Sequence, residues 1–413
     1  GMSVFLCDEG ALAGGSTSAW AKLLSGVPAA LTGLGSEDDA AEQGERERLI
    51  GAAPHVARPI RLVLPDPPAR SRLARLSRSA VKRALGRRIP SGAMPVSLGA
   101  DRSGATLRPD YVGGLEFPGA TIDDARLVVL TASDARTRGA EIHPRTRCVV
   151  AEREGTLWRL AMESDTGERY AITARVLVNA AGPWVPAVLD HVVHGHAKPR
   201  LRLVKSVSIV VPRLYAHDRG YVLRNTDGHT IFVTPYEGRF SLIGSSEEEF
   251  AGDPGEGEAD SADIAYLVSA VGRYFRRPLY DDDVVWAWAG VRVQPEAAER
   301  RFRGRRPGHA IEIDATGREP PLVTIVGGSI GFHRRLAEEV LERLAPTIGF
   351  RAPWTADAGL PGGLFPVDGL AELARGLRTL YPFLGAAHAA RLVSLYGTRG
   401  HTIVSGAPAM ADL

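Results

Sequence analysis

The sequence has little cysteine, and its two cysteines are far apart. Cys7 and Cys148 each lie in an apolar run that predicts a strand, and neither belongs to a CxxC or Cys/His spacing. That pattern excludes a disulfide-rich scaffold and offers no metal site, so we predict two buried thiols and no bound metal. Buried free thiols fit a reducing compartment.

Long hydrophobic runs are missing as well. No stretch approaches the roughly 18 consecutive apolar residues of a membrane-spanning helix, and the first residues lack the pattern of a signal peptide. We therefore expect a cytoplasmic protein, either free or peripheral on the cytoplasmic face of a membrane.

The chain also lacks an excess of charge of one sign. Its 50 basic and 48 acidic residues leave a net charge of +2. Because no overall field favours a polyanion, we predict no nucleic-acid partner. Lysine occurs at four positions only, so an enzyme that needs a lysine has few candidates here: Lys22, Lys82, Lys198 and Lys205.

Positive charge is nevertheless concentrated in one segment, Arg70–Arg88. It carries eight basic residues, and no acidic residue occurs between Asp66 and Asp101. Its leucines and alanines recur at roughly helical spacing, which is typical of a basic amphipathic helix that adsorbs to an anionic membrane surface. A solvated helix on a loop excursion explains the same pattern, and both interpretations stay open.

The chain is long enough for several compact units. Its 413 residues, 44% of them hydrophobic, can bury large cores and predict two to three domains. Between Val207 and Ser246 short strands alternate with turns, which indicates an antiparallel sheet. A Gly/Pro-rich linker from Pro353 to Pro366 then precedes a helical piece at the end of the sequence.

The most informative stretch is Val178 to Trp184, which follows a largely apolar strand predicted over Ala174–Leu177. Ala180, Ala181 and Gly182 are small, and Pro183 ends the strand's ladder of hydrogen bonds. Bare backbone of this kind can approach a flat group closely. A flavin is such a group.

Two further segments fit a nucleotide-binding fold. A strand over Ser3–Cys7 ends at Asp8, and an acidic residue at the end of the second strand of such a fold binds the ribose hydroxyls. A strand over Leu322–Val326 meets Gly327–Gly328 and a helix with one apolar face, so backbone amides converge on one spot. The helix is expected to present Leu336, Val340, Leu341 and Leu344 on that face.

These segments, with several others in the same order, resemble the FAD-dependent glycerol-3-phosphate dehydrogenases, within the wider group of DAO-like FAD-dependent oxidoreductases. The resemblance covers most of the chain. The stretches that carry it are Val178–Trp184, Asp123–Val128, Leu203–Lys205, Ile209–Arg213, Asp283–Trp286, Ala289–Arg292, Gly327–Gly328, Pro353–Thr355, Leu360–Gly363 and Tyr381–Leu384.

The resemblance implies an α/β fold with an α+β substrate domain. It places a Rossmann-like FAD-binding domain that lacks its first βα unit in residues 1–60, 118–200 and 310–350. An antiparallel-sheet substrate domain would take 61–117 and 201–309, and a short helical C-terminal domain 351–413. The sequence contains no GxGxxG, the turn that holds the FAD pyrophosphate, and we expect a chain clipped at both ends that binds FAD weakly or not at all.

The resemblance also assigns roles to single residues. Arg292 matches an arginine that binds the substrate phosphate, and Ser329 stands where the family has a lysine. We count both as catalytic candidates. The segment with Ser16 could equally be a plain helix cap, but the resemblance makes it part of the cofactor site. The cofactor-binding candidates are Asp8, Ser16, Thr17, Ser18, Cys148, Ala181, Gly182, Trp184, Gly327 and Gly328.

Several positions depart from the family pattern, and three of them replace ionisable groups of the pocket. Ser329 replaces a lysine, Ala29 an arginine and Ser208 a histidine. The resemblance implies oxidation of sn-glycerol 3-phosphate to dihydroxyacetone phosphate, with electrons passed to quinone or oxygen. The departures predict weak or absent turnover. Two alternatives stay open, a flavoenzyme whose pocket is rebuilt for another alcohol or amine and an inactive protein that binds a membrane surface or a partner.

Overall fold

The computed structural model describes residues 2–24, 39–68, 92–194, 199, 201–245, 248–296, 308–315, 317–349, 351–407 and 409. Two sequence predictions lie outside these ranges. They are the basic segment Arg70–Arg88 and the Ser25–Ala30 stretch that includes Ala29.

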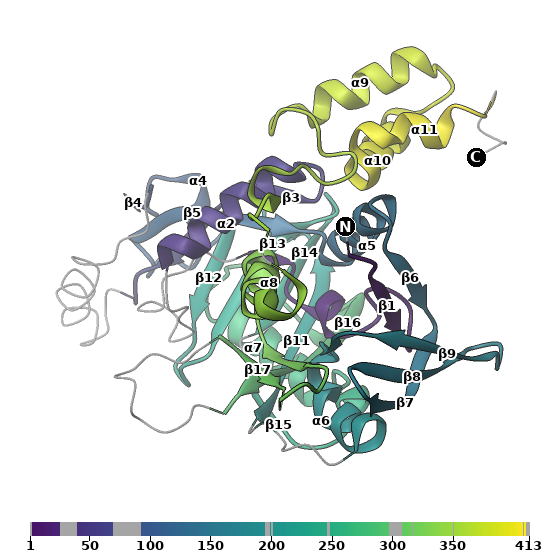
Figure 1. Ribbon diagram of the computed structural model, residues 1–413. Coiled ribbons are helices and arrows are strands. Elements are labelled where there is room, and N and C mark those ends of the chain that lie inside the picture. The colour runs from purple at the N-terminus through teal and green to yellow at the C-terminus, as the bar shows by residue number, and fades with distance from the viewer. Residues whose placement is uncertain are drawn as a thin grey trace.

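A ten-stranded, mostly antiparallel sheet forms the largest unit, and it confirms the antiparallel sheet expected between Val207 and Ser246 (Figure 1). One strand, β16 (Trp286–Pro295), pairs along nearly the whole of β11. The other strands, in sheet order, are β15 (Glu248–Phe250), β11 (Leu201–Pro212), β14 (Phe240–Ser245), β13 (Thr230–Tyr236), β12 (Gly220–Arg224), β3 (Ala57–Pro65), β5 (Gly114–Ile122) and β2 (Leu23–Leu24), with β4 (Met94–Val96) beside β5.

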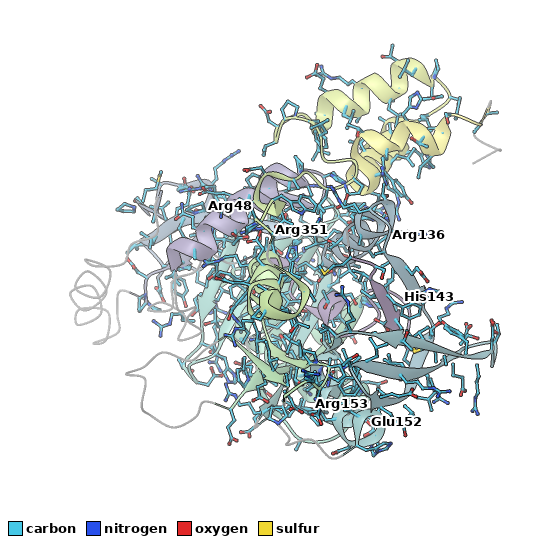
Figure 2. All side chains as sticks on the ribbon, viewed as in Figure 1. Arg48, Arg136, His143, Glu152, Arg153 and Arg351 are labelled. Atoms are coloured by element: carbon cyan, nitrogen blue, oxygen red, sulfur yellow. The ribbon has the colours of Figure 1, made fainter. Side chains whose placement is uncertain are left out.

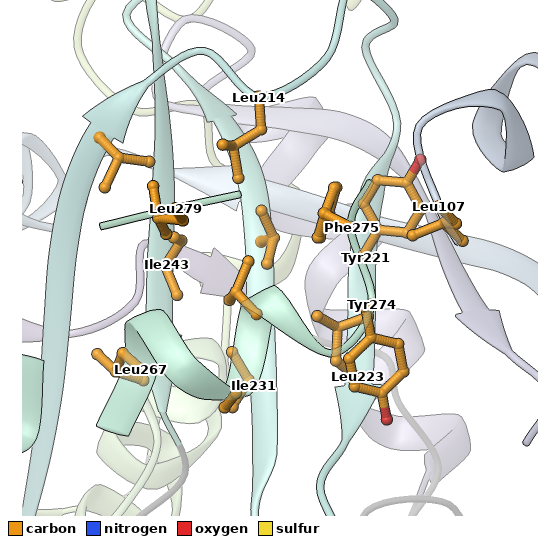
Figure 3. Packing of buried hydrophobic residues seen from close by; sticks show 14 of the residues in the cluster. Leu107, Leu214, Tyr221, Leu223, Ile231, Ile243, Leu267, Tyr274, Phe275 and Leu279 are labelled. Atoms are coloured by element: carbon orange, nitrogen blue, oxygen red, sulfur yellow. The ribbon is translucent and has the colours of Figure 1, made fainter. Parts of the chain in front are cut away.

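One face of this sheet is covered by α7 (Ser261–Gly272) and the turns around it. Alternate residues of β11, together with apolar residues of β12–β14, pack there against Leu267 and Phe275 (Figure 3). Asp260 begins α7 with a capping box, because its side chain accepts a hydrogen bond from Asp263 N while the Asp263 carboxylate accepts one from Asp260 N. This packed layer leaves only the other face of β11 and β16 for a ligand.

Three smaller sheets carry the α/β part of the fold. Parallel pairs of strands with helices between them are typical of nucleotide-binding folds, and the expected mixture of α/β and antiparallel structure is confirmed. The parallel pairs are β1 (Phe5–Asp8) with β6 (Glu141–Pro144) and β10 (Leu177–Asn179) with β18 (Leu322–Gly327). Antiparallel strands complete these sheets: β17 (His309–Asp314) beside β18, and the meander β7 (Thr146–Glu154), β8 (Leu157–Ser164) and β9 (Arg169–Ala174).

The helices complete the architecture. The C-terminal helices α9 to α11 stand together beyond α2 and α5 (Figure 1). Within the described ranges, every helix is too short or too polar to traverse a bilayer. The helices are α2 (Asp39–Ala52), α4 (Arg102–Ala105), α5 (Asp124–Thr137), α6 (Val185–Val188), α7, α8 (His333–Ile348), α9 (Leu370–Leu380), α10 (Ala386–Tyr396) and α11 (Gly400–Val404).

The structure corrects three local predictions. The strand expected over Ala174–Leu177 is wrong, because the chain bends after Ala174 and β10 runs through Val178 to Asn179. Leu341 is 49% exposed, since it lies about 100° around α8 from the buried Val340.

The third correction concerns the stretch 34–53, because its many charges and few large apolar residues predict a solvated helix and loop. It contains α2, but two of its charged residues, Glu45 and Arg46, are buried. The domain limits predicted at 60/61 and 117/118 fall inside β3 and β5, which pair through those positions. The division into domains stays a prediction, and we propose limits at the strand ends, 56/57 and 122/123.

Candidate functional site

The unpacked face of β11 and β16 is the centre of the candidate site. Antiparallel pairing places Ser206 opposite Gly290, Ser208 opposite Trp288 and Val204 opposite Arg292. Cross-strand partners share a face of the sheet. This face therefore carries small and polar residues, whereas Val207 and Ile209 between them point into the core.

The segment that follows η1 (Ser16–Ala19) lies directly against this face. A Cβ atom on Gly290 would lie 2.5 Å from the Ala19 Cβ, and one on Gly244 would lie 2.8 Å from the Ala21 Cβ. Real Cβ contacts are essentially never this short, so both glycines are needed where the backbones meet. Small residues on both sides hold η1 and β16 together.

Arg292 is the main cation of the site. Its guanidinium lies over the Trp20 ring, 4.6 Å from the ring centroid. Burial, and secondarily the nearby Arg202, lowers the pKa of Arg292 to about 10, so it remains a cation at neutral pH. A partly desolvated arginine held by an aromatic ring is well suited to bind an anion.

A second cation, Lys22, was missed as a site residue by the sequence reasoning. Its Nζ lies 2.6 Å from Asp124 Oδ1 and 5.7 Å from the centroid of the Trp288 ring. Its backbone has φ = 51°, a strained value for a residue with a side chain. The scarcity of lysine was the available signal, since Lys22 is one of only four.

Asp124 begins α5 and is fully buried beneath the site. Burial raises the pKa of its carboxyl, and the Lys22 ammonium offsets part of this rise. The carboxyl lies in the Asp123–Val128 stretch that carries part of the resemblance. Its contact with Lys22 spans 102 positions of the chain, and no local pattern could have shown it.

Several buried polar atoms at this face have no hydrogen-bond partner among the described residues. They are Ser208 Oγ, Trp288 Nε1 and Asp124 Oδ2. A buried polar group without a partner costs about 1–3 kcal/mol. Three such atoms in one place indicate that a polar ligand completes the site.

The Gly327–Gly328 turn closes the site from another side. Both glycines have positive φ, 78° and 101°, and a Cβ on Gly327 would lie 2.7 Å from the Gly308 carbonyl oxygen and 3.0 Å from Pro295 Cδ at the end of β16. Ser329 caps the next turn, because its Oγ accepts a hydrogen bond from Gly331 N. Ser329 thus has a structural role in this turn, and its assignment as a catalytic residue stays a prediction.

His333 lies at the start of α8, just beyond this turn. Its Nδ1 lies 2.7 Å from the Ile330 carbonyl oxygen, and burial lowers the pKa of the ring. The His333 ring is therefore neutral at neutral pH and adds no positive charge to the site.

The Val178–Trp184 run forms the remaining wall. The Asn179 amide donates to the Val185 carbonyl oxygen and accepts from Ala181 N, which folds the turn. Gly182 has φ = 57°, and Trp184 is 38% exposed beside Gly15 of the η1 segment. The small residues leave the backbone of this turn bare, as the sequence predicted, and the exposed Trp184 indole beside it is a finding of the structure.

The structure brings most of the predicted site residues together. Short contacts link η1, β16, η2 (Gly182–Trp184) and the end of β18, so Ser16–Ser18, Ala181–Trp184, Arg292 and Gly327–Gly328 surround one region. Asp8 lies exposed at the end of β1, where its carboxylate accepts a hydrogen bond from Gly10 N.

Cys148 is placed differently from the other candidates. It is half-buried in an apolar cluster, and burial raises the pKa of its thiol to about 12. Its assignment as a cofactor contact stays a prediction. In the part of the chain that the structure covers, no group of three or more His, Cys, Asp or Glu residues could hold a metal ion.

Comparisons with known proteins agree with this geometry. The family model described as FAD dependent oxidoreductase matches residues 1–331. The chain is 36% identical over 417 residues to a glycerol-3-phosphate dehydrogenase of Pseudomonas aeruginosa, covering 100% of this chain and 80% of that one. It is 35% identical to a D-erythritol 1-phosphate dehydrogenase of Brucella abortus, covering 100% and 83%.

A solved structure shows the same fold. The glycerol-3-phosphate dehydrogenase of Bacillus halodurans complexed with FAD superimposes with a TM-score of 0.74 at 24% identity, covering 98% of this chain and 73% of that one. At this identity the likeness concerns the fold alone.

Proposed function

The chain belongs to the family of FAD-dependent oxidoreductases, and on that premise we propose that it oxidises an alcohol group of a small phosphorylated polyol. Arg292 carries this proposal, because it places a partly desolvated cation on the one sheet face that is lined with small and unpartnered polar groups. The named relatives act on glycerol 3-phosphate and D-erythritol 1-phosphate, which share a phosphate monoester and a secondary alcohol.

FAD is the proposed cofactor, and several described residues fit it. The close approach of backbone at Gly290 and Gly327–Gly328 leaves room for a flat ring system, and the Asp8 carboxylate at a strand end suits a ribose hydroxyl. When bound, FAD supplies the acceptor for the hydride that leaves the alcohol carbon. The sequence contains no glycine-rich pyrophosphate turn, and weak FAD binding by the 413-residue chain stays a prediction.

The chain's own residues would perform three tasks. Arg292 would hold the substrate phosphate, with Trp20 fixing the plane of the guanidinium. Lys22 would add positive charge while Asp124 fixes its position. Ser208 and Trp288 would bond to substrate hydroxyls, which orients the alcohol carbon.

Removal of the hydroxyl proton is the weak step of this site. Ser208 stands where the resemblance expects a histidine, and a serine hydroxyl is a poor base at neutral pH. General-base catalysis contributes about 10²–10⁴-fold, so we expect oxidation far slower than in a site with an imidazole.

Flavin reduction under anaerobic conditions tests the proposal. The chain, loaded with excess FAD, is mixed with glycerol 3-phosphate, D-erythritol 1-phosphate or glycerol, and the loss of oxidised-flavin absorbance is followed. We expect slow reduction by the phosphorylated polyols and none by glycerol. Equal reduction by glycerol would contradict the proposed substrate class.

The unpartnered Ser208 and Trp288 also favour a second candidate, a pocket rebuilt for another alcohol or an amine. Adding unphosphorylated polyols and small amines to the same assay separates the two. Faster reduction by any of these than by glycerol 3-phosphate would select the second candidate.

For the electron acceptor we propose a membrane quinone, with oxygen as the alternative, and a cytoplasmic site of action at the membrane surface. The support is the sequence of Arg70–Arg88, with its eight basic residues. The chain should sediment with anionic vesicles at low salt and be released as salt rises. Equal binding to neutral vesicles, or none to either kind, would contradict a surface role for this segment.

A further inference from the structure

A cavity of about 420 Å³ lies outside the flavin-facing site. It is bordered by α2, by β3 and β5 of the large sheet, and by the loop before β12 (Figure 1). Its wall is rich in basic residues and includes none of the residues assigned above to cofactor or substrate. The basic residues are Arg46, Arg61, Arg102, Arg219 and His217.

Arg46, on α2, is the residue that identifies this cavity as a binding site. It is only 5% exposed and has no hydrogen bond or salt bridge within the described ranges, and its guanidinium is attracted at longer range by Glu47 and Glu42 of the same helix. Burial lowers the pKa of its guanidinium. Because a buried cation without a directly bonded partner is unfavourable, a guanidinium that lines a cavity in this way favours an anion as its ligand.

Some of the other arginines in the cavity wall pair with carboxylates, and one does not. Arg61 and Arg219 share the buried Glu116, at 2.7 and 3.1 Å, so they fix the shape of the wall more than they add charge. Arg219 also pairs with Asp101. Arg102 has no pairing partner within the described ranges and contributes a second free positive charge.

The remaining titratable groups reduce this charge only in part. Asp218 is 2.9 Å from Arg213, and Glu47 accepts a hydrogen bond from the Gln43 amide on the same helix. Burial, Arg219 and Arg102 lower the pKa of His217, so its ring is neutral above pH 6.5. Both ring nitrogens are engaged within the protein, Nε2 with the Tyr221 hydroxyl and Nδ1 as acceptor from Arg219 N. The cavity therefore presents two arginines from different elements, Arg46 and Arg102, that have no directly bonded partner within the described ranges.

We propose that this cavity binds a small phosphorylated metabolite through its phosphate monoester group. Two guanidinium groups from separate elements suit a tetrahedral dianion, whose oxygens point in several directions, better than a planar carboxylate. The volume leaves room for a small organic body beside the phosphate, since ligand pockets span about 300–1,000 Å³. This site is independent of the substrate site proposed at Arg292.

Calorimetric titration with inorganic phosphate at low ionic strength and pH 7.5, where the ion is mainly a dianion, tests the proposal. The full chain is titrated as Arg292→Met, which removes the proposed substrate anchor and isolates the new cavity. Arg46→Met and Arg102→Gln are each added to this background. Arg136→Gln, at the exposed end of α5, is the matched control for loss of one charge (Figure 2).

We expect one phosphate site to persist in Arg292→Met and in the control. Binding should weaken about 10- to 100-fold in the Arg46→Met and Arg102→Gln variants, because each removes one charged hydrogen-bond donor. Arg102→Gln alters an exposed side chain, so it remains informative if Arg46→Met unfolds the chain. The proposal is wrong if Arg292→Met loses all phosphate binding, or if binding is unchanged in both cavity variants. Neither result contradicts the proposed function.

Discussion

The two faces of β11 differ in packing and in polarity, although their side chains alternate along one strand. Val207, Ile209 and Val211 belong to a core where their neighbours are almost completely buried. Ser206 and Ser208 point to the opposite face, where Arg292 and Trp288 of β16 lie beside them. On that face two buried polar atoms, Ser208 Oγ and Trp288 Nε1, have no partner within the described ranges.

Neighbouring residues of β11 therefore serve different purposes: those on the apolar face stabilise the fold, and those on the polar face are available to a ligand. Side chains of a strand alternate in direction, so one backbone can bury a hydrophobic row and present a polar row to a ligand. The apolar face stabilises the strand. That stability allows the polar face to keep unpartnered groups that would be unfavourable in a core.

The largest expected effect is a loss of stability from the apolar face. Ile209→Ala should lower the free energy of unfolding by about 2–5 kcal/mol, because it leaves a cavity in a fully packed cluster. Urea denaturation measures this directly. A loss below about 1 kcal/mol would show that the two faces of β11 differ less than their packing indicates.

A buried histidine away from both faces of β11 tests whether unpartnered polar atoms are tolerated elsewhere. His55 is 1% exposed, both of its ring nitrogens lack partners within the described residues, and it packs against Gly362 and Gly397 near the C-terminal helices. Burial, followed by the nearby Arg58 and Arg126, lowers its pKa from 6.5 to about 4.

Because the folded pKa lies below the unfolded one, the unfolded state binds the proton more tightly between pH 6.5 and 4. The contribution of His55 is therefore fully present above pH 6.5 and is lost as the pH falls, by up to about 3 kcal/mol. Unfolding free energies at pH 7 and pH 4 measure this, with His55→Leu as the reference. The same pH dependence in His55→Leu would remove His55 as its cause.

On the polar face, Arg292→Met should affect ligand binding more than stability. We expect glycerol 3-phosphate to bind about 10- to 100-fold more weakly, a loss of about 1.5–3 kcal/mol for one charged hydrogen-bonding group. Calorimetry with the Arg46→Met background removes the contribution of the second cavity. Unchanged affinity would place the substrate phosphate elsewhere.

The smallest expected effect is that of Ser208→Ala on stability. The Ser208 hydroxyl is buried and has no partner among the described residues, so its removal should not lower the free energy of unfolding and should raise it by about 1 kcal/mol, the lower end of the cost of such a group. Ile209→Ala, one position along the same strand, is the matched comparison. A large loss in Ser208→Ala would mean that the hydroxyl bonds within the protein.

Much of the fold could be predicted from local patterns. The hairpin of β7 and β8 with its tip after Glu154, the strand β18 before Gly327, and helix α9 all follow from short-range alternation, glycine and helical spacing. The errors have local causes as well. The predicted strand Ala174–Leu177 missed the bend at Arg175, and Leu341 was assigned to the wrong side of α8.

The candidate site was predictable where it depends on one stretch of chain. Arg292 and the small residues of Val178–Trp184 could be selected because each belongs to a short run of consecutive residues that resembles the family. Lys22 could not, since its partner Asp124 and its aromatic neighbour Trp288 are distant in sequence. The same holds for Arg46, in a charged helix whose sequence indicated a solvated surface.

The sequence by itself determined the family, the alternation of β11 and β16, and the residue types available to bind an anion. Those features depend on neighbours within a few positions, where covalent geometry fixes which side chains share a face. Only the tertiary structure decided which cations are desolvated and which are neutralised. Charge pairing and burial depend on segments brought together across the fold. Glu116 pairs in this way with Arg61 and Arg219, whereas Arg46 has only the longer-range attraction of Glu47 and Glu42 on its own helix.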